Sequence, residues 1–211
     1  MEPKILPVFP LNLVAFPGEK LNLHIFEPRY RQLFRECEKE NKSFVVCPHY
    51  KGSNVPIGTE MILLGIEKKY PNGKMDVRTQ GIKLVKIVAF YKNIIYKLYG
   101  GVEVKYLPWD DESDFQLNQI LLEKLIQLYK IVDINEVPLG DSLSFRTFQV
   151  AHKVGFSFEQ ELEFLEIGSE KDRQSYMINH LEKFIPIVYE AEEMKRRARL
   201  NGHFKEASPP H

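Results

Sequence analysis

Alternating apolar and polar residues run through the first half of the chain and predict a series of β-strands. Leu21, Leu23 and Ile25 alternate with polar neighbours, which is the period-2 pattern of a half-buried strand. Pro-Asn-Gly at 71–73 predicts a hairpin turn, because Asn and Gly accept the positive φ angles of such turns. The other predicted strands, with a break or β-bulge at Gly81, cover residues 4–9, 43–47, 58–70, 74–80, 82–90 and 94–106. About six or seven short strands separated by turns are typical of a small barrel or sandwich.

One helix interrupts these strands. Its apolar face is predicted from residues at positions i, i+3, i+4 and i+7, which are Tyr30, Leu33, Phe34 and Cys37. Pro28 suits the first helical position, where the backbone N–H has no helical partner to lose. The run Phe-Glu-Pro-Arg-Tyr therefore ends a strand and begins a helix.

In the second half of the chain, the apolar period becomes that of helices. One helix is predicted at 115–132 and another at 142–154. Ser157 opens a capping box and Ser169 opens a similar pattern, so each should start a further helix. The last helix contains Pro186, which should kink or split it. The buried side of the first of these helices is expected to consist of Leu117, Ile120, Leu121, Leu125 and Leu128.

Together these patterns predict an α+β protein with two subdomains and a tail. Residues 1–107 are expected to form the β-rich subdomain with its one inserted helix. Residues 115–200 are expected to form a helical bundle that ends in a long helix, and the acidic segment 108–114 joins the two. Residues 201–211 are polar and are expected to be a disordered tail.

The composition is that of an ordinary globular protein and argues against several functional classes. Hydrophobic residues make up 44% of the chain and charged residues 27%. Lys+Arg and Asp+Glu are equal at 29 each, which argues against a nucleic-acid-binding protein, because phosphate contacts need a basic excess. No apolar run approaches the roughly 20 residues that cross a bilayer, and the N-terminus does not resemble a secretory signal. With two cysteines, we expect a cytoplasmic, reduced protein with no membrane partner.

The sequence contains few arrangements that carry chemistry. It has no GxxxxGK[ST] or GxGxxG phosphate loop, no HExxH and no GxSxG. Cys37, Cys47 and His49 could in principle hold zinc. Core packing is favoured instead, because Cys37 lies on an apolar helix face and Cys47 ends a buried strand. The sequence thus predicts no catalytic residue, no metal site and no cofactor.

Three charged clusters permit both a functional and a structural interpretation. Glu27 and Arg29 could be an acid–base pair, but Glu27 near a helix N-terminus and an Arg29 paired with a carboxylate or carbonyl explain them better. The acidic run 110–114 could bind a cation, but it lacks the EF-hand spacing and suits a solvated linker that favours the next helix start. The basic run 195–199 could meet nucleic acid or a membrane surface, but preceding acidic residues offset its charge.

Residues 6–33 closely resemble the opening of the N-terminal domain of Lon proteases. The family pattern is a Leu-Pro-x-Phe-Pro-Leu strand, a Phe-Pro-Gly turn, an alternating strand and a Phe-Glu-Pro-Arg-Tyr helix start. The residues that match it are Leu6, Pro7, Phe9, Pro10, Leu11, Phe16, Pro17, Gly18, Leu21, Leu23, Ile25, Phe26, Glu27, Pro28, Arg29 and Tyr30. A weaker likeness continues through 57–87 and 156–181, so the resemblance covers roughly residues 4–185.

The chain departs from the family pattern at a few positions. Lys83 and Leu84 stand where the family has an arginine and an aromatic residue, and Glu159 or Glu161 stands where it has a lysine. The resemblance implies a PUA-like β-barrel joined to a helical bundle, with a role in capturing unfolded or tagged polypeptide. Because no Walker loop follows, the chain resembles a stand-alone substrate-binding domain without the ATPase and protease modules, with which a separate ATP-dependent protease could act.

The function expected from these observations is that of a non-catalytic polypeptide-binding or adaptor module. An apolar groove, or strand addition at a hairpin edge, would be the physical route. The residues expected to contact polypeptide are Phe16, Pro17, Phe26, Arg29, Tyr91, Tyr96 and Tyr99. An RNA-binding PUA-like module is the alternative, against which the neutral charge balance argues. A cryptic peptidase is a third hypothesis, and no nucleophile–base–orienter set in the sequence supports it.

Overall fold

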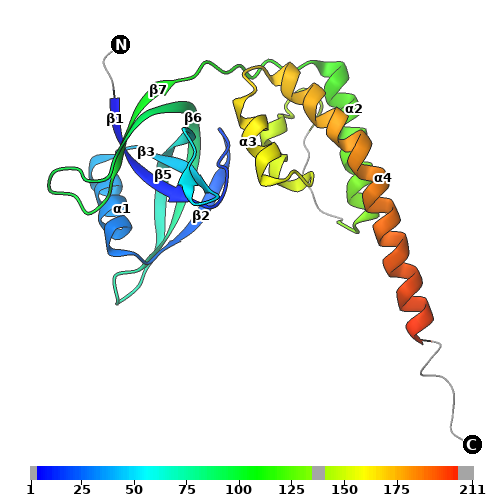
Figure 1. Ribbon diagram of the computed structural model, residues 1–211, viewed down its shortest axis with the longest axis horizontal. Helices are drawn as coiled ribbons and strands as arrows, with labels where there is room; N and C mark the ends of the chain where they lie inside the picture. Colours follow the sequence, from blue (N-terminus) through cyan, green and yellow to red (C-terminus); the bar gives the residue numbers. More distant parts are fainter. Residues whose placement is uncertain (1–3, 135–140, 204–211) are drawn as a thin grey trace, which may run out of the picture. The chain divides into compact units, whose positions relative to one another are not determined.

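The computed structural model describes residues 4–134 and 141–203, with side chains up to residue 199, and divides the chain into two compact units (Figure 1). The first unit comprises Met1–Asp110 and Ser157–Gly168, and the second comprises Asp111–Phe156 and Ser169–His211. The segment 157–168, which the sequence analysis assigned to the helical part, therefore groups with the strands. Of the predicted tail, 201–203 continue the last helix and 204–211 lie outside the described residues.

A seven-stranded sheet forms most of the first unit. The strands are β1 (Lys4–Leu11), β2 (Lys20–Ile25), β3 (Phe44–Tyr50), β4 (Ser53–Asn54), β5 (Ile57–Lys69), β6 (Met75–Tyr91) and β7 (Gly101–Tyr106). They pair antiparallel in the order β1-β7-β6-β5-β3-β4, and β2 pairs with β6. A parallel pairing of β1 with β3 places Val8 opposite Val45. The strands β1, β7, β6, β5 and β3 thus form a closed circuit of pairings.

Two of the predicted strands form the single long strand β6. The break expected at Gly81 is a bulge, as predicted, because the β5–β6 register shifts between Glu60 and Met61, where Gly81 faces Met61. The backbone of Gly81 also donates to the Glu19 carbonyl, at 2.9 Å. The strand predicted over 94–106 is wrong in its first half, since β7 begins at Gly101 and a loop precedes it.

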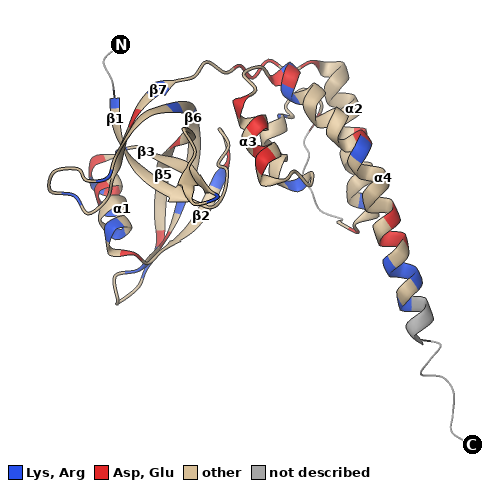
Figure 2. Ribbon diagram, viewed as in Figure 1, with Lys and Arg blue, Asp and Glu red and all other residues tan. Residues whose placement is uncertain are grey.

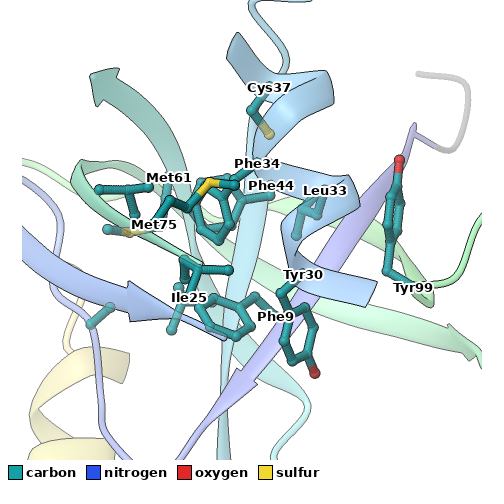
Figure 3. Close-up of a cluster of buried hydrophobic side chains, with 13 residues drawn as sticks. Phe9, Ile25, Tyr30, Leu33, Phe34, Cys37, Phe44, Met61, Met75 and Tyr99 are labelled. Atoms are coloured by element: carbon teal, nitrogen blue, oxygen red, sulfur yellow. The ribbon is translucent and has the colours of Figure 1, made fainter. Parts of the chain in front are cut away.

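The helix α1 (Pro28–Glu40) packs its predicted apolar face into the main core of this unit (Figure 3). Pro28 is its first residue, as predicted. The core around it consists of Phe9, Ala15, Ile25, Tyr30, Leu33, Phe34, Cys37, Phe44, Val46, Met61, Met75, Val77 and Tyr99. The ring of Phe34 lies 5.0 Å from that of Phe44 and 5.7 Å from that of Phe9, both edge-on. This packing holds α1 in a fixed place against the sheet.

The helix α3 (Phe158–Glu166) belongs to the same unit and begins at the predicted capping box. The Ser157 hydroxyl accepts from the Gln160 N–H, and the Gln160 side chain accepts from the Ser157 N–H at 2.9 Å. The ring of Phe158 stacks on that of Tyr50 at 4.4 Å, with the planes 10° apart. This contact joins the start of α3 to the end of β3.

In the second unit, α2 (Phe115–Ile131) pairs with α4 (Glu170–His203). Asp114 caps α2 by accepting from the N–H groups of the second and third helical residues, as the linker interpretation expected. Leu121, Leu125 and Leu128 are buried in α2 as predicted, but Leu117 is half-buried and Ile120 is exposed, and Asn118 and Tyr129 are buried instead. The Asn118 amide donates to the carbonyls of Ser142 and Phe145 at 2.8 and 3.2 Å, so tertiary hydrogen bonds compensate its burial.

Two further helix predictions need correction. The helix predicted at 142–154 is absent, and the described structure there contains two short 3₁₀ turns, Thr147–Gln149 and Ala151–Lys153. Of the kink or split predicted at Pro186, the split does not occur, since α4 continues through this proline. Despite its length, α4 is too polar to span a membrane, and no other helix in the described ranges meets that requirement.

Candidate functional site

The loop between β6 and β7, residues 92–100, contains the three most exposed large hydrophobic residues among those described in the first unit. The side chains of Ile95, Tyr96 and Leu98 are 79%, 96% and 65% exposed. Tyr96 also adopts a left-handed backbone conformation with φ at 61°, which is uncommon for a bulky residue. A cluster of apolar side chains held in solvent by an unusual backbone conformation suggests a contact surface.

Side chains on one face of α1 hold this loop in place. The amide oxygen of Gln32 accepts from the backbone N–H of Leu98 at 2.9 Å. One turn further along α1, a Glu36 carboxylate oxygen accepts from Lys97 Nζ at 2.7 Å and from the Tyr99 hydroxyl at 2.5 Å. Positions four apart lie above one another on a helix, so both side chains meet the same loop. The loop is therefore fixed to a rigid element.

The ends of the loop turn inward. Tyr99 is buried against the core that surrounds α1, and Figure 3 shows its ring standing beside the helix. Ile94 packs against the same core. Inward anchors at both ends and outward side chains between them explain how three apolar residues remain in solvent without collapsing onto the surface.

The ionisation states of the anchoring groups suit this role. Burial tends to raise the pKa of Glu36, but hydrogen bonds from Lys97, Tyr99 and Gln32 outweigh burial and leave the pKa below its ordinary value. Burial, followed by the hydrogen bond to Glu36, raises the pKa of the Tyr99 hydroxyl. At neutral pH the carboxylate is therefore charged and the phenol is a neutral donor.

Between α1 and this loop lies a groove of about 600 Å³. Its lining combines charged and apolar side chains, namely Pro28, Arg31, Gln32, Arg35, Glu36, Tyr96 and Leu98. Arg31 donates to the backbone carbonyl of Asn72, at 2.7 Å, in the turn between β5 and β6. We call this site the α1 groove. It can bury an apolar side chain against Tyr96 and Leu98 while its arginines contact polar groups.

A second, smaller pocket of about 200 Å³ lies where β2 leads into α1. Phe26 lines it and is exposed, and Glu27 lies at its edge. Arg29 does not line this pocket. Its guanidinium pairs with the Glu27 carboxylate at 2.8 Å, as expected from the sequence, and lies 4.7 Å from the Tyr30 ring centroid. Because the charge of Arg29 is already compensated, this pocket offers weaker recognition of a polar ligand than the α1 groove.

The structure separates the seven residues that the sequence analysis expected to contact polypeptide. Phe16, Pro17 and Tyr99 are buried. The exposed members are Phe26, Arg29, Tyr91 and Tyr96. Of these, Tyr96 lines the α1 groove.

Sequence reasoning missed the other residues of this site, which are Arg31, Gln32, Arg35, Glu36 and Leu98. A signal for the loop was present, because Ile94 and Ile95 are adjacent apolar residues that interrupt period-2 alternation, and Gly100-Gly101 follows shortly after. For the groove-facing residues of α1 no such signal exists, since their polar pattern is that of any solvent-exposed helix face.

The three residues considered for zinc lie in different surroundings. Cys37 is buried in the core around α1, and Cys47 is buried in a second apolar cluster. Burial raises the pKa of each thiol to about 12. His49 is exposed, and its Nδ1 lies 2.8 Å from the Asn54 side-chain oxygen. Across the described ranges, no three His, Cys, Asp or Glu side chains are grouped in a way that could hold a metal ion.

Comparisons with known proteins place this architecture in a family. Residues 5–183 match the model of the ATP-dependent protease La (LON) substrate-binding domain. The crystal structure of a Lon N-terminal domain protein from Xanthomonas campestris is similar, with a TM-score of 0.63 and 22% identity over 83% of this chain and 98% of that one. The N-terminal domain of the Mycobacterium avium complex Lon protease has a TM-score of 0.59 and 16% identity over 85% and 98% of the two chains. A search of curated proteins found no match.

Proposed function

The chain belongs to the Lon substrate-binding domain family, and from this we propose that it is a polypeptide-binding module whose contact surface is the α1 groove. The observation that carries the proposal is the apolar loop containing Ile95, Tyr96 and Leu98, which α1 holds in solvent because its side chains accept hydrogen bonds from the loop. We infer that the closed circuit of strands forms a PUA-like barrel, which supports α1 and the loop as a rigid base.

Unfolded polypeptide has the chemistry that this surface suits. It exposes apolar side chains that a folded protein hides, and each one buried against Tyr96 or Leu98 contributes about 1.5–3 kcal/mol before ordering costs. The fixed loop lowers the part of that cost that falls on the binding protein. Because a few side chains share the contact, we expect micromolar affinity and tolerance of many sequences.

We further propose that the module recognises polypeptide without cleaving it. In the described ranges, the buried thiols of Cys37 and Cys47 are poor nucleophiles, because their raised pKa values keep them protonated at neutral pH. His24 pairs with Asp76 at 2.6 Å. Among the described residues, no serine or cysteine is hydrogen-bonded to either of them, so a nucleophile–base–orienter set is missing there. A separate ATP-dependent protease would supply the cleavage.

Binding to a permanently unfolded client tests this proposal. Reduced, carboxymethylated lactalbumin should bind the chain in fluorescence anisotropy, and native lactalbumin should not. The double variant Tyr96→Asn/Leu98→Ser should weaken binding at least tenfold, because it removes two apolar contacts. Asparagine is chosen at position 96 because it tolerates the positive φ there, so the loop keeps its backbone conformation. Ile187→Ser, which removes a similarly exposed apolar residue from α4 in the other unit, is the matched control and should bind normally.

Two results would contradict the proposal in different ways. Equal binding of native and unfolded lactalbumin would refute a role in recognising unfolded polypeptide. Undiminished binding by the double variant would show that the contact surface lies elsewhere. Casein incubated with the chain, with and without nucleotide, should remain intact, and turnover that survives repurification would refute the non-catalytic assignment.

A further inference from the structure

Two arginines of the α1 groove carry charges that no carboxylate compensates. Among the residues that the structure describes, Arg31 donates to the Asn72 carbonyl and has no ion pair, and Arg35 is exposed with no hydrogen bond or ion pair. Glu36 also lines the groove, but its carboxylate is occupied by Lys97 and Tyr99. The groove therefore has a local positive charge in a chain whose total charge is zero.

The other two arginines of the first unit are both paired, which sets this site apart. Arg29 pairs with Glu27 at 2.8 Å and Arg78 with Glu67 at 3.2 Å. Lys69 donates to Glu38 at 2.9 Å. The pairing of these exposed side chains indicates that uncompensated guanidinium groups are not a general property of this surface.

The two guanidinium groups also converge. A Cβ placed on Gly73, at the turn between β5 and β6, would lie 2.7 Å from Nη1 of Arg31 and 3.5 Å from Nη2 of Arg35. Because both distances start from the same point, Nη1 of Arg31 and Nη2 of Arg35 lie no more than about 6 Å apart. Two like charges held this close repel each other unless an anion lies between or beside them.

The position on the helix adds to the positive potential. Figure 2 shows basic residues toward the N-terminal end of α1 and acidic residues toward its C-terminal end. The first turn contains no acidic residue, and the helix dipole adds partial positive charge at the same end. Glu27, the N-cap residue, complements this dipole and pairs with Arg29, so the uncompensated positive charge lies farther along the helix, at Arg31 and Arg35.

We propose that the α1 groove selects polypeptide segments in which an Asp or Glu side chain lies next to an apolar side chain. The carboxylate would dock on Arg31 and Arg35, whose planar guanidinium groups match it, while the apolar neighbour packs on Tyr96 and Leu98. This inference rests on the proposed polypeptide-binding function and names its preferred substrate class.

Polypeptide suits the site better than nucleic acid does. A nucleic-acid backbone needs a row of cations that follows its phosphates, and here two uncompensated guanidinium groups line the groove. Leu98 and Pro28 offer apolar contact, and the negatively charged Glu36 lies in the same lining. A single carboxylate beside an apolar side chain uses the two guanidinium groups and the apolar part of the lining.

The experiment compares two labelled, unstructured peptides of 12 residues with the same Leu-Phe centre, one with flanking Asp residues and one with Asn at those positions. Fluorescence anisotropy at 50 and 200 mM salt should show about tenfold tighter binding of the Asp peptide to the unmodified chain at the lower salt. Arg35→Gln should abolish this preference and retain binding of the Asn peptide. Arg78→Gln, which removes the same charge from a paired site in the same unit, is the matched control and should keep the preference.

The outcomes separate this inference from the function on which it rests. If both peptides bind equally and the Tyr96→Asn/Leu98→Ser variant loses both, the acidic preference is refuted and the proposed function stands. If neither peptide binds the unmodified chain, the proposed function itself is contradicted. If a single-stranded RNA oligonucleotide binds more tightly than the Asp peptide and Arg35→Gln abolishes that binding, the site is a nucleic-acid site and the inference is wrong.

Discussion

Replacing Arg173 with leucine should destabilise the second unit by about 3–5 kcal/mol, because it breaks a fully buried ion pair. Arg173 and Glu170 both have no exposed side-chain surface, and Arg173 Nε donates to the Glu170 carboxylate at 2.9 Å. The guanidinium also lies 4.3 Å from the ring centroid of Phe148. Without it, the Glu170 carboxylate keeps the N–H and hydroxyl of Thr147 as donors, at 2.7 and 2.9 Å, but loses the cation that compensates its charge.

The loss should depend on pH. Burial already raises the pKa of Glu170 above its ordinary value, even with Arg173 and Thr147 acting to lower it. Removing Arg173 should raise this pKa further. A carboxyl whose pKa is raised by folding favours the folded state below its unfolded pKa of about 4.3, and that contribution is lost as pH rises through the folded pKa. The deficit of Arg173→Leu should therefore be smaller at pH 5 than at pH 7.5.

Urea unfolding followed by circular dichroism at 222 nm measures this deficit, since α2 and α4 contribute most of the helix signal. The double variant Glu170→Gln/Arg173→Leu is the control. Its neutral amide can still accept from the Thr147 N–H, so much of the stability should return. A deficit under about 1 kcal/mol, or one that is equal at both pH values, would refute the assignment of Glu170 as a buried charge that Arg173 compensates.

Three further predictions concern the first unit. Cys37 and Cys47 should react with Ellman's reagent at pH 8 only after unfolding, because burial raises both pKa values to about 12, and prompt reaction of the folded chain would contradict this. Phe34→Ala should lower the free energy of urea unfolding by about 3–5 kcal/mol, since a fully buried ring is lost from the core. A loss near zero would contradict that packing. Gly81→Ala should lower the free energy of unfolding by about 1–3 kcal/mol, because its Cβ would collide with a backbone carbonyl oxygen. The control Gly65→Ala should lower it less, because a Cβ there meets nothing within 4 Å. Equal losses for the two variants would contradict this close approach.

Local patterns determined much of the fold. The buried face of α1 follows from apolar spacing, and Pro28 marks its first residue, because both depend on neighbours within one or two helical turns. The capping box at Ser157 and the bulge at Gly81 are equally local. The family likeness of residues 6–33 indicated which architecture to expect, but it could not assign a contact surface.

Tertiary contacts overrode local patterns at the positions that matter for binding. The strand predicted over 94–106 included residues 94–100, yet these form a loop, because Gln32 and Glu36 on α1 bind its backbone and side chains from far along the sequence. Asn118 takes an inward position on α2 that its polarity argued against, since three tertiary hydrogen bonds satisfy its side chain.

The sequence by itself thus determined most of the elements, the core face of α1 and the family likeness, because periodicity records which side of a segment is buried. The tertiary structure alone decided where the α1 groove lies and which of its charges remain uncompensated. Arg29 and Arg35 look alike in the sequence, but Glu27 pairs with the first and no described carboxylate reaches the second. Whether a charge is paired depends on distances across the fold, and a linear pattern does not contain them.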